Sequence, residues 1–152
     1  MVLGYLTARP SRNVILTANT EVTREWWDKR RRAFHLYTSQ AVVKEISQGD
    51  SEMASRRLEL VRDFRLLDLN QSVVNLAEQF LARSNLPPTA DVDAIHIAVA
   101  TVHGMDYLLT WNCKHIANAQ IQVKLAEISL EFGYDLPILC TPYVLEIDYV
   151  AR

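Results

Sequence analysis

The chain has 152 residues, a length typical of a single domain with one core, and we treat residues 1–152 as one domain. Hydrophobic residues make up 49% and charged residues 22%, as in an ordinary globular protein, and no uncharged run reaches about 18 residues, so no transmembrane helix is expected. The formal net charge of −2 excludes general binding of polyanions, so any contact with nucleic acid has to come from a local basic patch.

The first half of the chain alternates helical and strand patterns. Residues 11–32 have the apolar spacing of a helix, and 34–39 are rich in aromatic and β-favouring residues, which predicts a strand. A short helix over 41–49 is expected to end at Gly49, and the next, over 51–64, to begin with Ser51 as its N-cap. The short apolar run 65–69 predicts a buried strand.

The same alternation continues in the second half. A helix over 71–86 is ended by Pro87 and Pro88, and a helix over 91–103 is broken at Gly104. The remaining elements are predicted in the order buried strand 107–111, helix 119–133, strand 137–141 and terminal helical segment 142–149. Such alternation indicates an α/β fold with a three-layer arrangement, in which helices cover both faces of a parallel sheet.

Sites in parallel sheets lie beyond the carboxyl ends of the strands, and this rule selects three oxygen-bearing side chains. Asn112 directly follows the predicted strand 107–111, Glu45 lies in the helix after strand 34–39, and Asp93 begins an apolar helix at a crowded junction. For Glu45 the alternative is a solvated helix position beside Lys44. Asp91 is expected to act as a helix cap, because the helix dipole favours a carboxylate there.

If these three side chains meet, a cation is the natural way to relieve the repulsion between the carboxylates. Oxygen ligands without a histidine or cysteine partner suit Mg²⁺ or Mn²⁺. Such a metal supports hydrolysis of a phosphodiester. The sequence therefore predicts a metal site formed by Glu45, Asp93 and Asn112, with Glu45 and Asp93 as the catalytic residues.

At these positions the chain resembles the PIN domain family, which includes VapC-type toxins and RNA-processing nucleases. The resemblance rests on Glu45, on the motif D-A-x-H-I-A at 93–98, on Y-L-L-T-W-N at 107–112 followed by C-K-H-I-A-N-A, and on P-I-L-C-T-P at 137–142. In element order it covers essentially the full length. It implies a twisted parallel sheet flanked by helices, dependence on Mg²⁺ or Mn²⁺, and cleavage of RNA.

The chain departs from the family pattern in two places. Family members open with an apolar strand that ends in an aspartate, and residues 1–12 resemble the segment that follows this strand, so the first family aspartate has no counterpart. Loss of a central strand would leave its neighbours without backbone partners. We expect a start codon assigned too far downstream, with a shortened chain or an exchanged segment as alternatives. In addition, Asn112 stands where the family often has a late aspartate.

A basic stretch with two adjacent tryptophans, residues 24–32, is the candidate contact with RNA phosphates and bases. Its basic residues are Arg24, Lys29, Arg30, Arg31 and Arg32. The alternative is a solvated helix end whose tryptophans pack in a core or subunit contact. His96 and His103 share a helix face and are expected to be hydrogen-bonded packing residues rather than zinc ligands. His115 is expected to be structural.

Two functions remain open from the sequence. The first is a metal-dependent endoribonuclease of the PIN type, impaired by the missing aspartate, whose partner as a toxin would be a cognate antitoxin. The second is a non-catalytic RNA-binding or partner-binding module on the same fold. The apolar helices and the tryptophan pair favour a homodimer. Residues 1–12 lack a signal-peptide pattern, and Cys113 and Cys140 form no C-x-x-C pair, so a cytoplasmic location without disulfides is expected.

Overall fold

The computed structural model describes residues 2–146, in which helices predominate and each of the four strands is three residues long. None of the helices in this part of the chain is long and apolar enough to cross a membrane. In chain order the elements are α1 Val2–Leu6, α2 Val14–Lys29, a 3₁₀ turn Arg31–Ala33, β1 Tyr37–Ser39, α3 Gln40–Ile46, α4 Ser51–Val61, β2 Arg65–Leu67, α5 Gln71–Arg83, α6 Asp91–Val102, β3 Tyr107–Leu109, α7 Ala119–Glu131, β4 Ile138–Cys140 and α8 Pro142–Glu146.

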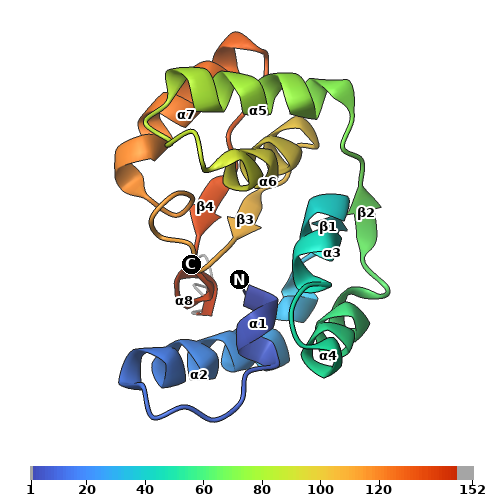
Figure 1. Ribbon diagram of the computed structural model, residues 1–152. Helices are drawn as coiled ribbons and strands as arrows, with labels where there is room; N and C mark the ends of the chain where they lie inside the picture. The colour runs from blue at the N-terminus through green and yellow to red at the C-terminus, as the bar shows by residue number, and fades with distance from the viewer. Residues whose placement is uncertain (1, 147–152) are drawn as a thin grey trace.

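The strands form two separate parallel pairs. β1 pairs with β2, with Tyr37 opposite Arg65, and β3 pairs with β4, with Tyr107 opposite Ile138. In Figure 1 the β3–β4 pair lies beside α5, α6 and α7, whereas α1 to α4 gather with β1 and β2 in the other part of the molecule. The predicted mixture of helices and parallel strands is therefore confirmed, but among residues 2–146 the strands do not join into one sheet.

Most predicted helices are present, and their ends have local causes. α4 begins after Asp50, whose side-chain oxygen accepts a hydrogen bond from Met53 N at 3.0 Å, so the expectation of Ser51 as N-cap was wrong by one residue. A carboxylate caps as well as a hydroxyl, and the pattern did not separate the two neighbours. α6 ends where Gly104 adopts a φ of +69°, with Met105 N donating to Ala100 O at 2.9 Å.

Hydrophobic side chains form one large cluster and one small cluster. The large cluster joins α5, α6, α7 and β4, and Phe80, Ile97, Leu125 and Ile128 in it are completely buried. The small cluster contains Leu3, Ile46 and Val61. α6 belongs to the large cluster because it is apolar on nearly every side, and such a helix is stable only when other elements surround it.

The burial of two strands differs from the expectation, one helix was not predicted, and the terminal helix agrees as far as the structure describes it. The strands at 65–69 and 107–111 were expected to be buried, yet Leu66 is 48% and Tyr107 is 40% exposed, because β1–β2 and β3–β4 each present open sides. Helix α1 was not predicted from residues 1–12. The terminal segment 142–149 is helical up to Glu146, and the rest of it lies outside the described residues.

Candidate functional site

Asp93 stands in the first turn of α6, and 22% of its side chain is exposed. The N-cap of this helix is Ala90, which makes no side-chain capping bond, so the expectation that Asp91 caps the helix was wrong. The chain turns into α6 through backbone bonds, in which Ala90 N donates to Pro87 O and Ala94 N donates to Ala90 O, both at 2.9 Å. Asp91 lies one position later and is exposed.

Both carboxylate oxygens of Asp93 accept hydrogen bonds. Asn112 Nδ2 donates to Oδ1 at 3.1 Å, and His115 Nδ1 lies 2.9 Å from Oδ2. The side-chain oxygen Oδ1 of Asn112 accepts a hydrogen bond from the backbone N–H of His115 at 2.9 Å. Asp93, Asn112 and His115 thus form a closed network, and the predicted proximity of Asp93 and Asn112 is confirmed.

Glu45 lies near the end of α3, which follows β1 directly and is capped by Ser39. Its carboxylate Oε2 is 2.9 Å from Nε2 of His96. This hydrogen bond holds the pKa of Glu45 below its usual value of 4.5, although partial burial acts in the opposite direction. Because His96 is three positions after Asp93, it lies on the same face of α6. Glu45 is therefore placed about one helical turn from Asp93.

The candidate residues share a cavity of about 680 Å³. Glu45, Asp93, His96 and Asn112 all line it, together with the whole of β1 and β3. The three residues selected from the sequence are therefore brought to one place by three separate elements. The sequence reasoning did not find His96 and His115 as partners of the two carboxylates. The only signal was their position, one turn after Asp93 and three residues after Asn112.

The side chains of Glu45, Asp93 and Asn112 meet only part of what a divalent metal ion requires of its ligands. Within residues 2–146 no group of three or more acidic, histidine or cysteine side chains is arranged to hold a metal ion. Asn112 turns its amide nitrogen toward Asp93, so metal binding through its oxygen requires the amide to rotate. However, Mg²⁺ is commonly held by one or two carboxylates while it keeps several waters and shares substrate phosphate oxygens. A site of this kind would use Asp93 and Glu45, which line the same cavity.

The basic residues of the stretch 24–32 are largely engaged within the chain. Arg24 donates to Ala8 O at 3.2 Å, Lys29 pairs with Glu25, and Arg30 Nε donates to Leu145 O at 3.4 Å. The Arg31 guanidinium lies 4.4 Å from the ring centre of Trp27, whose ring stacks with that of Phe64. Arg32 is exposed, and Trp26 is only 3% exposed. The tryptophans therefore have packing roles.

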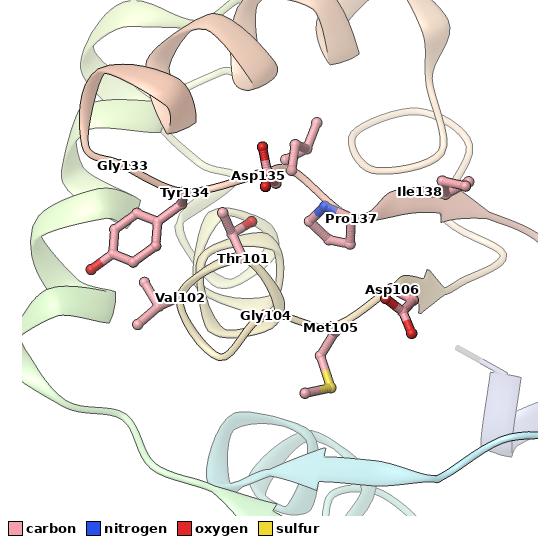
Figure 2. Close-up of a pocket in the computed structure, with 11 residues that line it drawn as sticks. Thr101, Val102, Gly104, Met105, Asp106, Gly133, Tyr134, Asp135, Pro137 and Ile138 are labelled. Carbon is pink, nitrogen blue, oxygen red and sulfur yellow. The ribbon is translucent and has the colours of Figure 1, made fainter.

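A smaller hollow of about 410 Å³ lies at the opposite end of the β3–β4 pair. Figure 2 shows Thr101 and Val102 at the end of α6 near Tyr134, with Asp106 just before β3. Since Asp106 and Pro137 precede their strands, this hollow is at the amino ends, away from the carboxyl edge that carries Asn112. None of the predicted site residues lines it.

His103, the C-cap residue of α6, is hydrogen-bonded within the fold, as expected. His103 Nε2 lies 2.8 Å from the carbonyl oxygen of Asp68, which ties the end of α6 to the segment after β2.

The chain matches no known family model, no curated protein and no solved structure. The geometry around Asp93 and Glu45 is therefore the feature of the molecule that bears on its function.

Proposed function

We propose that this protein is a divalent-metal-dependent endoribonuclease of the PIN type. The observation that supports the proposal best is the placement of Asp93 and Glu45 on one cavity, although they come from different helices and are 48 residues apart. The proposal includes a three-layer α/β/α fold of the PIN type. In such a fold, β1–β2 and β3–β4 would be the two halves of one parallel sheet. The proposal also includes a cytoplasmic location, a homodimer and, for a toxin, a cognate antitoxin.

Asp93 and Glu45 would hold Mg²⁺ or Mn²⁺, which activates water and neutralises phosphate charge when bound. Asn112 and His115 orient the carboxylate of Asp93 through the hydrogen bonds described above. His96 orients Glu45 in the same way. Partners of this kind usually affect metal affinity or activity by about 10- to 100-fold. Because two carboxylates carry the site, we expect the ion to bind weakly until RNA phosphate oxygens complete its shell.

The test compares Asp93→Asn with Asp91→Asn. The two residues lie in the same turn of α6, but only Asp93 lines the cavity. We expect Asp93→Asn to reduce Mg²⁺- or Mn²⁺-dependent cleavage of single-stranded RNA by about 100-fold or more, the contribution of a catalytic group. Asp91→Asn should cleave like the parent chain. Circular dichroism checks that both variants fold, and undiminished cleavage by a folded Asp93→Asn variant would rule out the proposed site.

A second candidate is a non-catalytic RNA-binding module on the same fold. It is favoured by the incomplete metal ligand set among residues 2–146 and by the exposed basic residue Arg32. In that case RNA binding should persist in EDTA without cleavage, and it should weaken steeply as salt rises. Filter binding and gel analysis of the same samples separate this candidate from the nuclease.

A further inference from the structure

Asn112 lies in a turn whose backbone is hydrogen-bonded on both sides. Thr110 N donates to Cys140 O at 2.9 Å, so the bonds between the β3 and β4 segments continue up to this residue. Thr110 Oγ1 then accepts a bond from Asn112 N at 2.9 Å, where the chain leaves the strand. Beyond the turn, Asn112 O accepts bonds from Ile116 N at 3.2 Å and Ala117 N at 2.8 Å. The main chain at Asn112 is therefore held from before and after.

Trp111, the residue between Thr110 and Asn112, ties this turn to helix α2. Its indole Nε1 donates to Thr23 Oγ1 at 2.8 Å, across 88 residues of sequence. Thr23 is completely buried, and its hydroxyl donates to Asn19 O at 2.6 Å. Because that hydroxyl proton is used within α2, the Thr23 oxygen offers a lone pair to the indole, whose N–H is only a donor. The bonds therefore run in one direction, from the turn to the backbone of α2.

The indole ring is also packed against a second element. The ring centre of Tyr5 in α1 lies 5.6 Å from that of Trp111, and the two ring planes meet at 57°. Tilted aromatic pairs at this distance are favourable. Asn19 Nδ2 donates to the Tyr5 hydroxyl at 3.4 Å, so the same residue of α2 contacts both Tyr5 and Thr23. The side chain of Trp111 is thus fixed relative to α1 and α2.

The turn supplies two of the groups that surround Asp93. Asn112 Nδ2 donates to Asp93 Oδ1, and Asn112 Oδ1 accepts from His115 N. The ring of His115 contacts the other carboxylate oxygen of Asp93. Hydrogen bonds weaken steeply when their angle leaves the preferred range, so these contacts depend on where the backbone of Asn112 lies. Trp111 does not line the cavity, so it acts on the site only through its neighbour in the chain.

We propose that Trp111 and Thr23 are positioning residues, which hold Asn112, and through it Asp93, in place from outside the cavity. Without the indole bond the turn gains conformational freedom, and the bond from Asn112 to Asp93 is formed for a smaller fraction of the time. The consequence for metal binding rests on the proposed function, because groups that orient a metal ligand affect metal affinity. The placement of Asn112 does not depend on that function.

The first experiment measures the placement of Asn112 in EDTA and without RNA. Two-dimensional NMR follows the exchange of its side-chain NH₂ hydrogens with water, which the bond to Asp93 slows. Trp111→Phe removes the indole N–H but keeps an aromatic ring, and it should accelerate this exchange about threefold to tenfold, the effect of one hydrogen bond. Thr23→Val should do the same, whereas Thr23→Ser keeps the hydroxyl and should behave like the parent chain. Equal exchange in the parent and Trp111→Phe would overturn the proposal.

The second experiment separates positioning from general stability. In cleavage assays with RNA, Trp111→Phe should raise the Mg²⁺ or Mn²⁺ concentration that gives half the maximal rate about threefold to tenfold. Its rate at saturating metal should stay near that of the parent. Ser129→Ala is the control, because Ser129 is completely buried and donates to Leu125 O at 2.7 Å but does not line the cavity. It should lower the free energy of unfolding without shifting the metal concentration. An unshifted concentration in Trp111→Phe would contradict its role in the site.

These two readouts distinguish failure of this inference from failure of the proposed function. If the parent chain shows no metal-dependent cleavage, the nuclease is ruled out, while faster amide exchange in Trp111→Phe still supports the positioning of Asn112. If the parent cleaves RNA and exchange is unchanged in Trp111→Phe, the positioning role is ruled out and the nuclease stands.

Discussion

The two hydrophobic clusters differ in size and in the elements that they hold together. Fifteen buried residues form the large cluster around α5, α6 and α7, whereas three form the small cluster around α1, α3 and α4. Stability within a protein follows the amount of buried apolar contact, so the two regions should open with different free energies. We therefore expect the region with β1 to be the less stable side of the cavity.

The cause is visible in the helices. α6 reads D-V-D-A-I-H-I-A-V-A-T-V and buries six of its residues, whereas α4 reads S-E-M-A-S-R-R-L-E-L-V and buries two. Four of the eleven residues of α4 are charged, and its ion pair between Arg56 and Glu52 is solvent-exposed. Exposed pairs of this kind contribute little to stability. The ion pair of α4 therefore does not compensate for the smaller apolar area that the small cluster buries.

The largest expected effect on the free energy of unfolding comes from replacing one large buried side chain in each cluster by alanine. Phe80→Ala should lower the free energy of unfolding by about 3–5 kcal/mol, because the completely buried ring leaves a cavity in the large cluster. Ile46→Ala should cost about 2–5 kcal/mol and accelerate hydrogen exchange mainly in α1, α3 and α4. Val74→Ala, at a 38% exposed position of α5, is the control and should change little. Uniform acceleration of exchange in Ile46→Ala would contradict two regions of unequal stability.

A smaller effect distinguishes two of the buried threonines, Thr23 and Thr38. Thr23→Val breaks two hydrogen bonds and leaves Trp111 Nε1 without its acceptor, so the free energy of unfolding should fall by about 1–3 kcal/mol. Thr38→Val removes a hydroxyl that makes no bond, so the free chain should be equally stable or more stable. Urea denaturation of both variants measures the difference. A large loss in Thr38→Val would mean that its hydroxyl has a partner in solution.

The smallest effect concerns the pair of Glu45 and His96, which joins the two regions. Since the folded pKa of Glu45 lies below 4.5, its stabilising contribution is present above about pH 4.5 and is lost as the pH falls through the lowered value. With 42% of the Glu45 side chain exposed, we expect about 1 kcal/mol or less. Denaturation between about pH 3 and 6, a range that spans the usual glutamate pKa of 4.5, should show a shallower dependence of stability on pH for Glu45→Gln.

Glu131→Gln is the matched control for that measurement. The pKa of Glu131 is also lowered, by its bond to Arg83, but this pair lies on α5 and α7 beside the large cluster. Its substitution should leave hydrogen exchange in α3 unchanged at every pH. Identical exchange profiles for Glu45→Gln and Glu131→Gln would show that Glu45 does not link the regions.

Local pattern sufficed for most of the secondary structure and for part of the site. The periodic apolar positions of α2, α5 and α7 and the breaks at Pro87 and Gly104 act over a few residues, so they are readable in one dimension. The proximity of Asp93 and Asn112 followed from one general rule about strand ends. The N-cap of α4 was missed because Asp50 and Ser51 are both good caps.

Tertiary structure decided the rest, because it depends on which distant groups are brought together. The apolar runs at 65–69 and 107–111 predict strands, but only the fold shows that β1–β2 and β3–β4 remain separate pairs with open edges. His115 and His96 acquire carboxylate partners 22 and 51 residues away, and Thr23 meets Trp111 across 88 residues. Side-chain periodicity records which face of an element is buried, but it does not record which element lies against that face.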